Sequence, residues 1–204
     1  MQLSAAGNIM GKKEGEIIVS AWKHFKTITT HKLLVMDGCF KVGLYKQGLL
    51  HDLSKYSPTE FRIGAKYYQG TRSPNAAERR DKGYSEAWMH HKGRNRHHYE
   101  YWTDMSRVTG RYESVPMPRK YLAEMVADRV AACKVYEGDG YTTGSALAYL
   151  TKSRERNLME PQTLKQLTYL LTMLQERGEK ETYRYIKNEV LKGKPFPWEA
   201  SQKS

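Results

Sequence analysis

Apolar side chains recur along this chain at intervals of three and four residues, the spacing of one face of an α-helix. Residues 14–28 form the first such segment. Thr30 is suited to cap a second helix, whose apolar stripe begins at His31 and ends at Val42. Stretches that alternate between polar and apolar residues are scarce, so the pattern predicts helices and almost no strands.

The clearest helix start is the sequence Ser57-Pro58-Thr59-Glu60. Ser57 can cap the helix, Pro58 suits its first turn, and Glu60 completes a capping box. This start predicts a helix that reaches Tyr68. The polar residues 69–83 predict a surface loop.

Further helices follow from the same spacing. Gly93 predicts a bend between two of them, and Gly138 predicts the end of another. The predicted segments are 85–92, 95–105, 119–137, 142–154, 161–177 and 179–191. The proline-rich residues 195–198 predict an extended strap.

The pattern therefore predicts an all-α protein with a single helical domain. We expect this domain to cover residues 14–192, between a flexible N-terminal tail at 1–13 and a C-terminal tail at 193–204.

Composition narrows the class of protein. Aromatic residues make up 11% of the chain, too many for a disordered protein, and no run of about 18 apolar residues predicts a membrane span. Residues 1–15 lack the apolar core of a secretory signal. Cys39 and Cys133 lie in apolar segments and are interpreted as reduced, buried thiols. We expect a cytoplasmic protein without a membrane partner.

Charge indicates the chemistry of a partner. Lys and Arg number 34 against 22 Asp and Glu, which gives a formal net charge of +12. Such an excess favours an anionic partner, or else serves only as a solvated basic surface. Its densest cluster, Lys92, Arg94 and Arg96, lies among four histidines. Arginine forks bind phosphate oxygens, and Lys55 adds a further charge, so these residues predict an anion pocket.

The candidate metal ligands centre on His51-Asp52, directly after the apolar pair Leu49-Leu50. His51 alone also suits a core position satisfied by hydrogen bonds. His31 and Asp128, however, each lie on a separate apolar helix face, and imidazole with carboxylate is a ligand set for divalent transition ions. Adjacent residues diverge by about 100° on a helix, so His51 and Asp52 can share an ion only near a helix end or where the helix is distorted.

Together, His31…His51-Asp52…Asp128 resembles the H…HD…D signature of the HD superfamily of metal-dependent phosphohydrolases. The chain is still more similar to a family of bacterial and phage proteins without an established substrate. The blocks that carry this resemblance are HDLSKYSPTEF (51–61), HHKGRNRHHYEYW (90–102) and EMVADRVAA (124–132).

The resemblance implies an HD-domain-like helical bundle with additional C-terminal helices. It implies one or two divalent ions (Mn, Fe, Co, Ni or Zn). The ligands it implies are His31, His51, Asp52 and Asp128 for one ion. One histidine from each of the pairs His90-His91 and His97-His98 would bind a second ion, and His91 and His98 are the preferred two. His24 is the alternative to His31, because the first histidine of HD proteins usually lies more than 20 residues before the HD pair.

The implied function is metal-dependent hydrolysis of a phosphomonoester or phosphodiester, nucleotides included. Asp52 and Lys55 are the candidate catalytic residues, and Lys55, Lys92, Arg94 and Arg96 the candidate substrate-binding residues. Two alternatives stay open: a di-iron oxygenase with the same fold, and a non-catalytic nucleotide- or nucleic-acid-binding protein with a structural metal. We expect a phosphorylated small molecule or nucleotide as the partner in preference to a nucleic acid.

Overall fold

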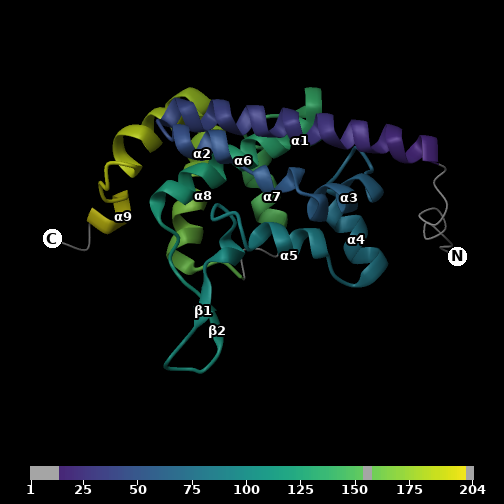
Figure 1. Cartoon of the computed structure of the whole chain (residues 1–204). Helices are drawn as coiled ribbons and strands as arrows, with labels where there is room; N and C mark the ends of the chain where they lie inside the picture. Colours follow the sequence, from purple (N-terminus) through teal and green to yellow (C-terminus); the bar gives the residue numbers. More distant parts are fainter. Residues whose placement is uncertain (1–13, 154–157, 201–204) are drawn as a thin grey trace, which may run out of the picture. The chain divides into compact units, whose positions relative to one another are not determined.

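The structure is a computed structural model that describes residues 14–153 and 158–200. It confirms an all-α protein, since the described residues form helices and one two-stranded hairpin (Figure 1). The tail predicted at 1–13 lies outside the described residues, as do the last four residues of the tail predicted at 193–204.

The chain divides into two compact units. Among the described residues, the first unit combines those up to Thr30 with Leu53–His91, and the second combines His31–Asp52 with those from Lys92 onward. The single domain predicted over 14–192 stays a prediction.

Helix α1 spans Glu14–Val42 without the break predicted at Thr30. That prediction was wrong because no glycine or proline lies between Gly15 and Gly38. The Thr27 hydroxyl donates to the Lys23 carbonyl at 3.0 Å, so a threonine in this stretch satisfies its side chain within the helix.

The first unit contains the beginning of α1, the 3₁₀ turn η1 (Leu53–Tyr56), α3 (Pro58–Lys66), α4 (Pro74–Lys82) and most of α5 (Glu86–Lys92). Ser57 caps α3 as predicted, with its hydroxyl accepting from the Glu60 amide at 3.4 Å.

The polar stretch predicted as a loop instead contains α4. Glu78 of this helix is fully buried and accepts from the Ser85 hydroxyl at 2.6 Å. It also accepts from the amides of Glu86 and Ala87. A carboxylate on one helix thus satisfies the amides that open the next one, a long-range contact that a polar composition does not reveal.

The second unit contains the end of α1, α2 (Tyr45–Leu50), the 3₁₀ turn η2 (Tyr99–Tyr101) and an antiparallel hairpin. The hairpin pairs β1 (Thr103–Met105) with β2 (Tyr112–Ser114) and projects as an arm (Figure 1). It overturns the helix predicted over 95–105. Gly110, at a φ of 66°, lies in the connecting turn, where a positive φ favours glycine.

Helix α6 (Arg119–Glu137) agrees with the prediction and ends at Gly138. It is followed by the 3₁₀ turn η3 (Gly138–Gly140), α7 (Ser145–Lys152), α8 (Pro161–Tyr185), the π-helical turn η5 (Ile186–Val190) and α9 (Pro197–Ala200). Gly178, with a φ of 76°, kinks α8 at the predicted boundary between two helices. The extended strap predicted at 195–198 is wrong in part, because helix α9 begins at Pro197. Phe196, just before this helix, is buried in the core.

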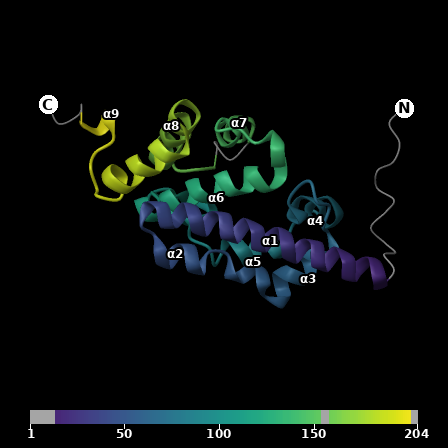
Figure 2. The ribbon, with the colours of Figure 1, turned by 90° about the horizontal axis from the view of Figure 1, so that it is seen from above.

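The core of the second unit surrounds α6. Every residue from Leu122 to Ala127 is buried, so this helix has contacts on several sides and not on one stripe. Figure 2 shows it between the second half of α1 and the helices α7 and α8. Gly38 allows the close approach of α1, since a Cβ there would lie 3.0 Å from that of Ala127.

Both cysteines are buried and free, as predicted. Burial is the main cause that raises the pKa of Cys39 to about 12 and that of Cys133 to about 11, so neither thiol is a reactive nucleophile at neutral pH. Among the described helices, none has both the length and the apolar character that crossing a bilayer requires.

His24 packs against α3 in the first unit. Its ring lies 5.4 Å from that of Phe61, and a Cβ on Gly64 would lie only 2.2 Å from its Nε2. Burial first, and the charge of Lys55 second, lower the pKa of His24 from 6.5 to about 4. The glycine at 64 is therefore required by the imidazole, which stays uncharged in the folded protein.

We expect Gly64→Ala to lower the free energy of unfolding by about 1–3 kcal/mol, because the added methyl displaces a buried ring. Urea denaturation measures the change. Gly140→Ala is the matched control, since a Cβ there meets nothing within 4 Å. In a His24→Ala background the cost of Gly64→Ala should largely disappear, and an equal cost in both backgrounds would contradict this packing.

We also expect His24 to make stability depend on pH. Its folded-state pKa lies below the unfolded value, so between pH 6.5 and 4 the unfolded chain binds the extra proton. The contribution of His24 to the free energy of unfolding is therefore complete above pH 6.5 and falls by about 3 kcal/mol towards pH 4. The free energy of unfolding is measured against pH for the wild type and for His24→Asn, and the difference between the two curves isolates this contribution. A difference that does not change with pH would refute it.

Candidate metal centre

The turn at His51-Asp52 places both side chains in one site. Helix α2 ends at Leu50, and His51 follows with a ψ of 127°. Asp52 has a φ of 51°, the one positive φ outside glycine among the described residues. Such a conformation costs on the order of 1 kcal/mol or more and is found mainly at functional sites. The expectation that the pair lies at a helix end is confirmed.

Lys32 holds this turn from α1. Its ammonium donates to the carbonyl of Leu49 at 2.6 Å and to that of His51 at 2.9 Å. A positive charge at the carboxyl end of α2 also complements the helix dipole. Burial lowers the pKa of Lys32, while the charge of Asp52 opposes that shift.

Four predicted ligands of the second unit converge. His31 Nε2 lies 2.9 Å from Asp128 Oδ1 and 3.8 Å from Asp52 Oδ2, and His51 Nε2 lies 3.3 Å from that same Asp52 oxygen. The four donor atoms all lie within 4.8 Å of one another. Ligands that share an ion at about 2.1 Å are about 3.0–3.4 Å apart, so the spacing fits a single divalent ion.

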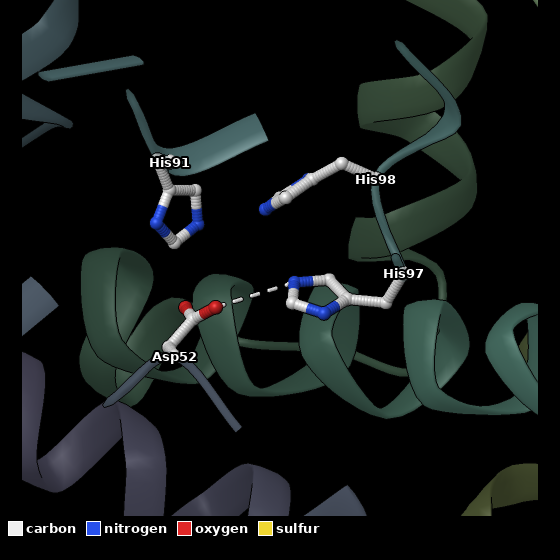
Figure 3. Close-up of side chains that lie close together, drawn as sticks. All are labelled: Asp52, His91, His97 and His98. Atoms are coloured by element: carbon white, nitrogen blue, oxygen red, sulfur yellow. Dashed lines mark ion pairs between the residues drawn. The ribbon is translucent and has the colours of Figure 1, made fainter. Parts of the chain in front are cut away.

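The other oxygen of Asp52 faces a second group of histidines. Asp52 Oδ1 lies 3.4 Å from His97 Nε2, the ion pair dashed in Figure 3. The ring of His98, next in the chain, lies 4.2 Å from that of His97. Asp52, His97 and His98 each offer a donor atom within 4.8 Å of the others, so one carboxylate can serve two ion positions.

Glu124 lies behind two of these rings. Its Oε1 is 3.0 Å from Nδ1 of His51 and 3.2 Å from Nδ1 of His97, and all three residues are buried. Helix α6 carries Glu124 one turn before Asp128, so both carboxylates face the same site. Sequence reasoning missed Glu124, and it named His97 only as an alternative to His98. The signal for Glu124 was its four-residue spacing from the predicted ligand.

Buried charge makes this centre favourable for a cation. Burial by itself would raise the pKa of Asp128, but hydrogen bonds from His31 and His51 hold it well below its usual range. Burial also opposes the lowered pKa of Glu124, which results from His51 and His97. Burial would lower the pKa of His51, yet the Asp52 charge and the carboxylate hydrogen bonds raise it. Negative charge is thus concentrated where water is largely excluded.

The first unit places His91 on another glutamate. Glu60 is buried, with Oε1 2.6 Å from His90 Nδ1 and Oε2 2.8 Å from His91 Nδ1. Burial opposes the lowered pKa of Glu60, and His91 is the main cause of it. The carboxylate of Glu60 therefore binds imidazoles and does not complete the predicted capping box, because the Ser57 amide donates to the Ser54 carbonyl instead. His91 is buried, as a ligand would be. Helix α5 ends at Lys92, so the seven-residue spacing from His91 to His98 is not a helical repeat.

The predicted substrate-binding residues lie in several settings. Lys55 is half-buried in η1, and Lys92 is half-buried at the end of α5. Arg94 and Arg96 are exposed. The Arg96 guanidinium lies over the rings of Tyr101 and Tyr121 and donates to the Tyr121 hydroxyl at 3.2 Å. The anion pocket stays a prediction.

His31 joins the His51 cluster, whereas its alternative, His24, packs in the first unit against Phe61.

Comparison with known proteins identifies a family of unknown function, DUF5662, whose pattern matches residues 20–173. The match covers the His51-Asp52 turn, Glu124 and Asp128. No curated protein and no solved structure matches the chain.

We expect Lys32→Met to lower the free energy of unfolding by about 1–2 kcal/mol, because two carbonyls at the turn lose their charged donor. Lys23→Met is the matched control on the same helix, since the Lys23 side chain is exposed and its removal should change stability by less than about 0.5 kcal/mol. Denaturation of the two variants makes the comparison. Equal effects would show that Lys32 does not support the turn.

Proposed function

The chain belongs to the DUF5662 family, and we propose that this family member is a metal-dependent phosphohydrolase acting on a phosphomonoester or phosphodiester. The observation that carries the proposal is the convergence of His31, His51, Asp52 and Asp128 at spacings suited to one divalent ion. The similarity of these residues to the H…HD…D signature supports hydrolysis as the reaction.

The residues of the second unit have separate roles in metal binding and proton transfer. His31, His51, Asp52 and Asp128 would hold the first ion, a transition ion such as Mn²⁺, Fe²⁺, Co²⁺, Ni²⁺ or Zn²⁺. An ion held there would supply an activated water, because divalent metals lower the pKa of a coordinated water towards about 7. Asp52 is the candidate to accept a proton, because its Oδ1 and Oδ2 are both directed at the cluster.

A second ion is supported by the other side of Asp52. His97 and His98 approach it from the loop that precedes η2. The sequence resemblance adds His91.

We propose that Lys55, with Lys92, Arg94 and Arg96, neutralises the oxygens of the phosphoryl group, because lysine and arginine are the side chains that bind phosphate.

Metal analysis of the purified protein tests the site. We expect one or two transition ions per chain, and we expect the double variant His51→Ala/Asp52→Ala to lose them. Asp37→Ala, which removes an exposed carboxylate of α1, is the control and should retain them. Added ion at 100 times its Kd should stabilise the wild type by about 2.7 kcal/mol. A double variant with full metal content would refute the site.

A phosphatase and phosphodiesterase screen over nucleotides, with Mn²⁺, Co²⁺, Ni²⁺ and Fe²⁺, tests the reaction. Phosphate or nucleoside release that depends on the ion and disappears in the double variant supports hydrolysis. Oxygen consumption without phosphate release favours the di-iron oxygenase. Binding without turnover that weakens steeply with salt favours a nucleic-acid-binding protein.

A further inference from the structure

We propose that Glu124 is a positioning residue that keeps a proton on Nδ1 of both His51 and His97, so that both rings present Nε2 to Asp52. The contacts are direct. A single oxygen, Glu124 Oε1, lies 3.0 Å from one Nδ1 and 3.2 Å from the other. The consequence for metal binding rests on the proposed function, whereas the position of the protons is a property of the protein itself.

The chemistry of the carboxylate determines which nitrogen carries the proton. An ionised carboxylate only accepts hydrogen bonds, so a ring nitrogen at hydrogen-bond distance from it must donate. His51 and His97 therefore both keep the Nδ1–H. If either ring loses a proton, the proton leaves from Nε2, and Nε2 becomes the atom that can bind an ion.

The Nε2 atoms, on the opposite edges of the two rings, face Asp52. His51 Nε2 lies 3.3 Å from Asp52 Oδ2, and His97 Nε2 lies 3.4 Å from Asp52 Oδ1. Without Glu124, the neutral rings could move their proton to Nε2 and donate to Asp52. The site would then satisfy its own hydrogen bonds with the atoms that bind the ion. Glu124 disfavours this neutral form, because it holds a proton at the far side of both rings, so that a neutral ring leaves Nε2 unprotonated.

The first unit contains a parallel arrangement. Glu60 is also buried and also binds two histidines through Nδ1, one with each of its oxygens. In each unit, a glutamate thus binds two imidazoles through their Nδ1 atoms. Glu60 is for this reason a useful comparator for Glu124, since each has its own pair of rings.

Long-range ¹H–¹⁵N NMR of the histidine rings, with and without Zn²⁺, tests the inference. In the wild type we expect Nδ1–H at His51 and His97 in both conditions. In Glu124→Leu these rings should lose that pattern and the affinity for Zn²⁺ should fall about 10- to 100-fold. Glu124→Gln, whose amide oxygen still accepts, should restore the Nδ1–H pattern and recover part of the affinity.

Two further variants separate positioning from a general loss of structure. Glu60→Gln should affect only the signals of His90 and His91, and Glu137→Leu, at the far end of α6, should affect none of the four rings. If Glu124→Leu does not fold, Glu124→Gln decides by its ring signals. Rings of His51 and His97 that carry a proton on Nε2 and none on Nδ1 in the wild type, or unchanged rings and zinc affinity in Glu124→Leu, would overturn the inference. A wild type that retains both Nδ1–H signals but binds no zinc would support the positioning and contradict the proposed function.

Discussion

The gathering of three carboxylates around one histidine is the constraint on which the centre of the second unit depends. Asp52 and Glu124 are buried and Asp128 is half-buried, and each has an oxygen within 3.6 Å of a His51 nitrogen. Such a group is tolerated only where positive charge or hydrogen-bond donors compensate it. His31, His51 and His97 supply the donors in the protein alone, and a divalent ion would supply the charge. The same balance explains why the pKa of His51 is raised while those of Glu124 and Asp128 are lowered.

The helices that hold these groups are arranged around α6. Glu124 and Asp128 of this helix are one turn apart, and the close approach of α1 at Gly38 and Ala127 places His31 opposite them. The turn at His51-Asp52 then enters with a positive φ, held by Lys32. The strained turn is therefore stabilised by the surrounding packing, as expected of a conformation retained for binding.

Local signals predicted the elements that depend on local chemistry. The α6 boundaries and the Ser57 cap follow from proline, glycine and a short polar side chain, each of which acts on its neighbours in the chain. The hairpin at 103–114 and the helix α4 were not predicted, because both depend on distant partners. Glu78 reaches the amides that open α5, and Val115 donates to the Trp102 carbonyl.

The sequence by itself determined the all-α class, the helix that carries Asp128, and the candidacy of His31, His51, Asp52 and Asp128 as ligands. Residue type and spacing suffice for these, because metal chemistry selects imidazole and carboxylate wherever they occur. Only the tertiary structure decided that Glu124 lies behind His51 and that His97 faces Asp52. These contacts join residues that are 73 and 45 positions apart. Packing around α6 brings them together, and no local pattern along the chain encodes which atoms then meet.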